Sequence, residues 1–287
     1  MTQTANSTLH ILPRGEWGEY MRVTPESAGW EHLGFAARLL RRDEVWEGQT
    51  GAFEYGLVVL GGVCSVHSSR GSWPAMGRRA DVFSGMPYGL YLPPDTRFSV
   101  KAESEKLDLA CGWCAAAGLH PPRLVTPETS AVEIRGGGNA TRQINSIFPP
   151  GFGCERLVAV EVFTPGGNWS SYPPHKHDVH RVDAAGQLLE ADLEEVYFYK
   201  ISPPQGYAIQ RVYTSDARLD ATMVARNNQV VLVPEGYHPV AAAPGYNTYY
   251  LNFLAGSAQS LANSDDPTHA WVKETWREKD PRLPLVK

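Results

Sequence analysis

Short apolar runs separated by glycine, proline or other turn residues recur along the first part of the chain. They are rich in β-branched and aromatic residues and too short for most helices, which predicts β-strands. Their close and regular spacing favours a β-sandwich or barrel. The strand-sized runs cover residues 55–60, 62–66, 81–83, 88–92, 97–101 and 107–115.

The second part of the chain repeats this rhythm, with β-type runs at residues 157–163, 195–201, 207–213, 228–233, 238–242 and 248–254. Residues 91–100 resemble residues 231–240 in position and character, which indicates a duplicated barrel. Between the two parts, residues 118–150 are rich in proline and glycine and are interpreted as the crossing. We therefore predict one barrel over residues 1–130 and a second over residues 131–287.

The charged tail from Ser257 to Lys287 differs from the strand-rich part of the chain. Its residues 268–279 predict a short helix, packed back onto the second barrel by Trp271 and Trp276.

Composition narrows the class of protein. The 287 residues carry a formal net charge of -5, which supplies no basic field for nucleic acid. The start of the chain lacks a basic segment followed by an apolar run, and no stretch reaches the length of a membrane span. Four cysteines are too few for a disulfide framework. These features predict a cytoplasmic protein without membrane or nucleic-acid partners, with Cys111 and Cys114 as ordinary buried thiols. Association into a homo-oligomer stays open.

His175 and His177 are the most informative pair of residues in the chain. Alternate side chains of a β-strand share a face, so this His-x-His pair can point two imidazole nitrogens into one cavity. A lone surface pair of this kind is more often a solvated turn. The isolated His67 and His180 are accordingly interpreted as structural or surface residues.

A carboxylate and a third histidine complete the pattern. Glu195 opens an aromatic strand, and His238 follows a Pro-x-Gly turn at a strand of its own. In a closed barrel, ligands from three strands can converge on one interior point. Imidazole and carboxylate groups suit Zn, Mn, Fe, Ni or Co. The sequence therefore predicts a divalent metal site at His175, His177, Glu195 and His238, with zinc favoured and Glu194 as the alternative carboxylate ligand.

These motifs resemble the two metal-binding motifs of the cupin superfamily, here His175-x-His177, Glu195 and Pro234-x-Gly236-x-His238. More narrowly, the chain is similar to the 5-deoxy-glucuronate isomerase family of bicupin enzymes in bacterial inositol catabolism. The segments that carry this likeness are residues 168–178, 193–200, 204–214, 233–240 and 244–256. The resemblance implies two double-stranded β-helix (jelly-roll) barrels, with a metal motif in the second alone.

The resemblance also implies a reaction, the conversion of 5-deoxy-D-glucuronate to 5-dehydro-2-deoxy-D-gluconate. This aldose-to-ketose isomerisation moves a proton between two carbons through an enediolate, whose negative charge a divalent ion would stabilise as a Lewis acid. The alternatives are an iron-dependent bicupin dioxygenase with the same ligand set, and a non-catalytic sugar-binding cupin.

Residues for proton transfer and substrate binding are harder to choose. Glu194 would face away from Glu195 on a regular strand, and a β-bulge would be needed to bring it into the cavity. Arg211, mid-strand among apolar residues, is predicted to bind the substrate carboxylate, since its guanidinium matches two oxygens. A structural ion pair is the alternative for Arg211. The full candidate set is Glu194, Tyr207 and Arg211 for catalysis, with Arg211, Gln210, Tyr213 and Arg142 for substrate binding; Arg135, Arg142 and Asn145 are either anion-binding or simply solvated.

Overall fold

The computed structural model describes residues 8–118 and 120–287. Almost all of its regular structure is antiparallel β-sheet, and its helical segments are short. This confirms the predicted all-β class. The helical segments include α2 (Pro25–Ala28), η1 (Val82–Ser84), η2 (Gly138–Ala140) and η3 (Ala270–Thr275).

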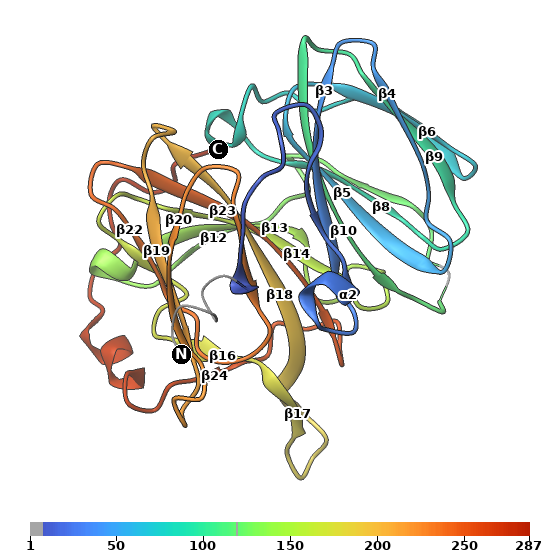
Figure 1. Ribbon diagram of the computed structural model, residues 1–287. Helices are drawn as coiled ribbons and strands as arrows, with labels where there is room; N and C mark the ends of the chain where they lie inside the picture. The colour runs from blue at the N-terminus through green and yellow to red at the C-terminus, as the bar shows by residue number, and fades with distance from the viewer. Residues whose placement is uncertain (1–7, 119) are drawn as a thin grey trace.

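The first half of the chain forms two sheets that face each other (Figure 1). The larger sheet has the strand order β11 (Arg123–Val125), β8 (Tyr88–Leu92), β5 (Phe53–Gly61), β10 (Lys106–Ala115), β3 (Gly34–Arg41) and β2 (Gly18–Val23). The smaller sheet has the order β4 (Val45–Gln49), β9 (Arg97–Ala102), β6 (Cys64–Ser68) and β7 (Gly71–Met76).

The second half repeats this arrangement. Its larger sheet runs in the order β1 (His10–Ile11), β21 (Val230–Val233), β18 (Leu188–Ser202), β23 (Asn247–Gly256), β14 (Val158–Thr164), β13 (Arg142–Phe148) and β12 (Val132–Arg135), with β17 (Asp178–Val182) on β18. Its smaller sheet has the order β15 (Trp169–Ser170), β22 (Val240–Ala242), β19 (Ala208–Tyr213) and β20 (Asp220–Ala225). A separate ribbon pairs β16 (His175–Lys176) with β24 (Ser264–Asp265).

The two halves correspond strand by strand. In the larger sheets, β10 lies between β5 and β3 as β23 lies between β18 and β14. In the smaller sheets, β9 and β6 are neighbours as β22 and β19 are. The chain therefore contains two barrels of the same design, each built from two sheets. The start of the chain also contributes a strand to the second half, because β1 pairs with β21.

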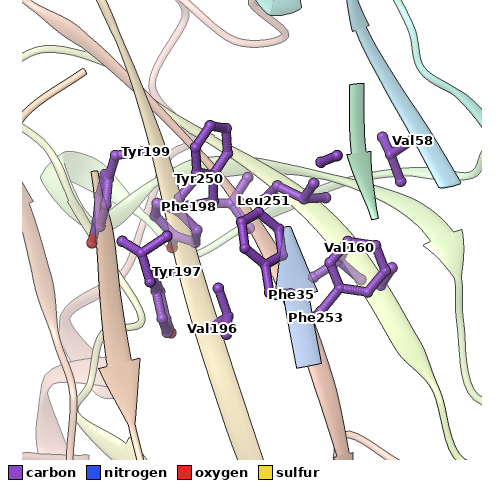
Figure 2. Packing of buried hydrophobic residues seen from close by; sticks show 14 of the residues in the cluster. Phe35, Val58, Val160, Val196, Tyr197, Phe198, Tyr199, Tyr250, Leu251 and Phe253 are labelled. Atoms are coloured by element: carbon purple, nitrogen blue, oxygen red, sulfur yellow. The ribbon is translucent and has the colours of Figure 1, made fainter. Parts of the chain in front are cut away.

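Aromatic side chains from both halves pack together where the barrels meet (Figure 2). The ring of Phe35 lies 5.4 Å from that of Phe198 and 6.0 Å from that of Phe253, centroid to centroid. A Cβ added at Gly112 would lie 2.4 Å from the Phe253 ring. The larger sheets thus pack face to face, and a glycine permits the closest approach.

Buried polar groups also connect the two halves. Arg79 of the first half donates to both carboxylate oxygens of Glu161 at 3.0 and 3.1 Å, and both side chains are almost fully buried. Glu54 of the first half accepts from three backbone N–H groups at residues 155–157, each at 2.8 Å. Apolar and charged contacts together hold the barrels as one unit.

Outside the barrels, the structure partly supports the predicted tail helix. Residues 270–275 form η3, a 3-10 segment shorter than expected. Trp276 packs against Gly137, whereas Trp271 is exposed, so the prediction that both tryptophans pack back is wrong for Trp271. All four cysteines are free and buried, which agrees with the prediction made for Cys111 and Cys114. Among the described residues, none of the helices has the length and apolar character needed to cross a membrane.

Candidate metal centre

Strand β18 places Glu195 inside the second barrel. It is flanked by β21 and β23, and Glu195 lies opposite Val233 on one neighbour and Leu254 on the other. The side chains of Glu195, Tyr197 and Tyr199 share one face of the strand because alternate residues point the same way. All three are buried. The carboxylate is therefore held in the barrel interior by a central strand.

Two histidines meet Glu195 at this point. The Nε2 atom of His177 lies 3.0 Å from Oε2 of Glu195, and the Nε2 atom of His238 lies 3.3 Å from the same oxygen. One ligand atom from each of the three residues lies within 4.8 Å of the other two. Among the residues that the structure describes, this is the only such group of histidine, cysteine or acidic side chains.

Hydrogen bonds fix how the two imidazoles are protonated. Nδ1 of His177 lies 2.9 Å from the Leu193 carbonyl oxygen, and Nδ1 of His238 lies 2.8 Å from that of Gly236. A carbonyl only accepts, so each Nδ1 carries a proton and donates it. In the neutral ring, each Nε2 then presents a lone pair.

The donor set fits a cation. Both Nε2 lone pairs and a carboxylate oxygen, all electron donors, converge in a buried space. Nε2 of His238 is fully buried and makes no hydrogen bond among the described residues. An unsatisfied buried acceptor is costly, and a shared cation between these three atoms would relieve that cost. Two imidazoles and a carboxylate are a common ligand set for divalent transition metals.

The charge states of these groups follow from burial and from each other. Burial alone would raise the pKa of Glu195, but the two imidazoles facing it hold that pKa down to about 2. Burial opposes the imidazolium form of His177, but the hydrogen bond from its Nε2 to Glu195 and the charge of Glu195 outweigh it and raise the pKa of His177, and metal binding would displace that Nε2 proton. Glu195 is therefore an anion at neutral pH, as a metal ligand must be.

His175 stands beside this group, on β16. Its ring centroid lies 4.8 Å from that of His238, and the rings meet edge to face. Burial, followed by the neighbouring His238, keeps the pKa of His175 well below its usual value, so the imidazole is neutral. The structure thus brings together all four predicted ligands, although His175 contributes no atom to the 4.8 Å group.

A cavity opens next to the four residues, with about 520 Å³ of space between its atoms, part of it open to solvent. Glu195 is the only carboxylate among its described lining residues. Hydroxyl and amide groups from Ser171, Tyr197, Tyr250, Asn252 and Asn263 give it a polar wall. The rest of the lining is His175, Arg135, Arg142, Ile144, Val160, Val162 and Leu261.

Glu194 does not reach this cavity. Its carboxylate accepts hydrogen bonds from the backbone N–H groups of Glu31, His32 and Leu33, at 2.5, 2.9 and 2.8 Å. No bulge occurs between Glu194 and Glu195 in the pairing of β18 with β23. Neither a ligand role nor a proton-transfer role for Glu194 is supported, because its side chain faces the first half of the chain.

Arg211 is also outside the cavity, so the structure does not support the prediction that it binds the substrate carboxylate there. On β19, Ala208, Gln210 and Val212 point into the barrel, whereas Arg211 points outward. Its guanidinium donates two hydrogen bonds of 2.8 Å to Asp220. The structural ion pair considered as the alternative is what the structure contains.

Three other candidates lie away from the cavity as well. Gln210 is buried and accepts a 2.7 Å hydrogen bond from the hydroxyl of Tyr199. The hydroxyl of Tyr213 donates to Asp266 at 2.6 Å. Tyr207 is 38% exposed on the barrel surface. None of the three lines the metal-site cavity.

Arg142 is the substrate-binding candidate that does line the cavity. The other two polar candidates of this segment already have partners. Arg135 lines the same cavity but pairs with Glu133, and the side chain of Asn145 is buried and donates to Glu161. Arg142 alone is both buried and without an acidic partner among the described residues.

Sequence reasoning missed the hydroxyl groups on the cavity wall. The Tyr197 hydroxyl lies 2.9 Å from Ser171 Oγ, which lies 3.4 Å from the Tyr250 hydroxyl. Burial raises the pKa of both tyrosines, so both phenols keep their protons at neutral pH. The signal for Tyr197 was present, because a residue two positions after Glu195 on a strand must share its face.

Comparisons with known proteins agree with this architecture. The KduI/IolB family profile matches residues 10–272. A 5-deoxy-glucuronate isomerase from Geobacillus thermodenitrificans is 45% identical over 261 residues, which covers 91% of this chain and 93% of the relative. A second, from Listeria monocytogenes, is 38% identical over 245 residues, covering 85% of this chain and 88% of the relative.

Solved structures show the same relationship. The crystal structure of an IolB-like protein from Salmonella typhimurium superposes with a TM-score of 0.88 at 37% identity, covering 92% of this chain and 98% of that one. Oxalate decarboxylase from Bacillus subtilis is similar in fold alone, with a TM-score of 0.61 at 13% identity over 90% of this chain and 79% of that one. A further structure of that enzyme is described with Mn(II) centres.

Proposed function

The chain belongs to the KduI/IolB family, and on that premise we propose that it is an isomerase of inositol catabolism. Its substrate is 5-deoxy-D-glucuronate, and its product is 5-dehydro-2-deoxy-D-gluconate. The names of its relatives support this activity. The observation that carries the chemistry is the convergence of two Nε2 lone pairs and a buried carboxylate beside a polar cavity.

A divalent ion is proposed to be held by His175, His177, Glu195 and His238. The unsatisfied Nε2 of His238 and the fixed tautomers of His177 and His238 support this assignment. Zn²⁺ is favoured by the imidazole and carboxylate ligands, with Mn, Fe, Ni and Co as alternatives. When bound, the ion supplies Lewis-acid stabilisation of negative charge that develops on the sugar oxygens.

The reaction requires no external oxidant or reductant. A proton leaves the carbon next to the aldehyde, a proton is added to the former aldehyde carbon, and the carbonyl group moves by one position. The chain contributes a polar cavity and protonated hydroxyl groups on Tyr197, Ser171 and Tyr250, which can donate hydrogen bonds to substrate oxygens. Those hydrogen bonds gain strength where water is excluded.

The direct test is turnover of 5-deoxy-D-glucuronate by purified protein without oxygen, followed by NMR in D2O. Ketose formation should be lost with a chelator and return when the metal is restored. His177→Ala should lose turnover, whereas His180→Ala should keep it, because His180 is an exposed residue bonded to Ser257.

Failure to form the ketose with metal bound would refute the isomerase assignment. A strict need for oxygen would favour the dioxygenase. Unimpaired sugar binding by His177→Ala, in a protein with no turnover, would instead favour a sugar-binding cupin.

A further inference from the structure

Arg142 is a buried cation that forms no ion pair with any residue that the structure describes. It is 6% exposed, and its only hydrogen bonds to described residues run from Nη1 to the carbonyl oxygens of Ala140 at 3.2 Å and Tyr172 at 3.0 Å. Carbonyl groups orient a guanidinium but carry no countercharge. Unpaired buried charges are costly and tend to mark functional sites.

The fold fixes this guanidinium in place. Gly136 has a φ of +89°, and a Cβ there would lie 2.0 Å from the Ala140 carbonyl oxygen and 2.9 Å from Nη1 of Arg142. The backbone N–H of Gly138 donates to the backbone carbonyl oxygen of Glu278 at 2.7 Å, so the C-terminal tail packs against this turn. The bond to Tyr172 ties Arg142 to the segment that leads into His175. The geometry is that of a positioned group, and a free surface arginine would show none of these constraints.

The guanidinium of Arg142 lies at the wall of the metal-site cavity. Arg142 lines the same cavity as His175 and Glu195, and Glu195 faces the imidazoles. Burial lowers the pKa of Arg142 to about 10, which still leaves it a cation at pH 7. The second arginine of the wall, Arg135, is already paired with Glu133 through two hydrogen bonds. Arg142 is thus the cavity's cation without an internal partner among the described residues.

We propose that Arg142 binds the carboxylate of the sugar acid and thereby selects uronates over neutral aldoses at this site. The proposal rests on the proposed isomerase function and names its specificity-determining residue. The substrate would lie with its carboxylate on Arg142, its aldehyde end toward His175 and Glu195, and its hydroxyls among the hydroxyl and amide groups of the wall. A planar guanidinium matches a carboxylate in both shape and charge.

Two substrates separate charge recognition from general binding. 5-Deoxy-D-glucuronate and 5-deoxy-D-glucose differ in the terminal carboxylate, which the second replaces with a hydroxymethyl group. For wild-type protein, kcat/KM should favour the acid. Arg142→Gln should lower kcat/KM for the acid by about 10- to 150-fold, the range for hydrogen bonds to a charged group. The neutral sugar should change by less than about threefold. Arg142→Lys, which keeps the charge, should lie between.

Arg211→Gln is the matched control, because its guanidinium is exposed and paired with Asp220 outside the cavity. It should leave both sugars unaffected. Bound metal and thermal unfolding are measured for every variant. An equal fall for the acid and the neutral sugar, with or without loss of metal, would overturn the proposal and leave Arg142 as a structural residue. Unchanged values for Arg142→Gln would overturn it as well.

Measurement of 5-deoxy-D-glucuronate binding by calorimetry distinguishes failure of the Arg142 proposal from failure of the isomerase assignment. If metal-loaded wild-type protein converts neither sugar, the isomerase proposal fails. Weaker binding of the acid to Arg142→Gln than to wild type would still support the carboxylate site in that case. Equal binding by the two proteins would refute it.

Discussion

The buried ion pair between Arg79 and Glu161 offers a quantitative test of how the two barrels are joined. Arg79 is in the first half and Glu161 is on β14 in the second. Their side chains are 1% and 0% exposed. Besides Arg79, Glu161 accepts from Asn145 at 2.9 Å and from the Tyr249 hydroxyl at 3.1 Å.

The expected loss follows from what Arg79→Leu leaves behind. Glu161 would remain buried with two neutral donors and no cation. Removing one partner of a buried ion pair typically costs about 3–5 kcal/mol. In a chain of this size, 1 kcal/mol corresponds to about 2 °C in Tm, so Tm should fall by about 6–10 °C.

The assay is thermal unfolding by calorimetry of the single variants Arg79→Leu and Glu161→Leu and of the double variant. Replacing both partners removes the isolated charge, so the double variant should recover much of the loss. Arg78→Leu is the matched control. The guanidinium of Arg78 contacts Glu128 on the surface, where ion pairs contribute at most about 1 kcal/mol.

Two results would refute the reasoning. The first is unfolding of Arg79→Leu within about 2 °C of wild type, as expected for the surface control. The second is a loss of stability in the double variant as large as the losses of the two single variants combined. Either outcome would mean that the ion pair does not couple the two halves.

Further variants test the site and the packing. Glu195→Gln should lose more than about 100-fold in metal affinity, whereas Glu194→Gln, which anchors the strand from outside the site, should lose about 10- to 100-fold and about 1–3 kcal/mol of stability. Metal analysis and calorimetry compare the two, and a larger loss of metal affinity in Glu194→Gln than in Glu195→Gln would contradict the assignment of faces. Tyr197→Phe should retain metal and lower kcat about 100-fold, the effect of removing one donor to a developing oxyanion; an unchanged kcat would exclude that role. Gly112→Ala places a Cβ 2.4 Å from the Phe253 ring and should cost about 1–3 kcal/mol in thermal unfolding; an unchanged Tm would show that the interface can relax.

The grouping of the candidate metal ligands could be predicted because strand alternation is a local property. His175 and His177 are two residues apart, and Glu195 heads an aromatic strand, so the face of each side chain follows from the sequence. The expectation that three strands converge on one point came from the duplicated barrel pattern and the family resemblance. In the structure, the N–H of Leu193 on β18 donates to the carbonyl oxygen of His177, and Glu195 lies opposite Val233 of β21, the strand that leads to His238.

Arg211 shows where the same reasoning fails. Alternation predicts that Gln210 and Arg211 face opposite ways, but it does not say which one faces the core. The apolar neighbour Ile209 suggested a buried surface, yet Ile209 is 41% exposed on the outer face of β19. The polar Gln210 takes the inner position, where its Oε1 accepts a hydrogen bond from the Tyr199 hydroxyl although its Nε2 has no partner among the described residues. Such a partner, from another strand, cannot be read from local pattern.

The adjacent residues Glu194 and Glu195 explain what a barrel without a metal motif contributes to the site. Glu195 faces the histidines, and Glu194 faces the backbone amides of residues 31–33 in the first half. Those three donors anchor the strand at the position next to the carboxylate ligand. A ligand must be held within a fraction of an ångström to bind metal well, and neighbouring contacts provide that precision. The first barrel therefore supports the proposed metal centre through β18, although none of the proposed ligands comes from its described residues.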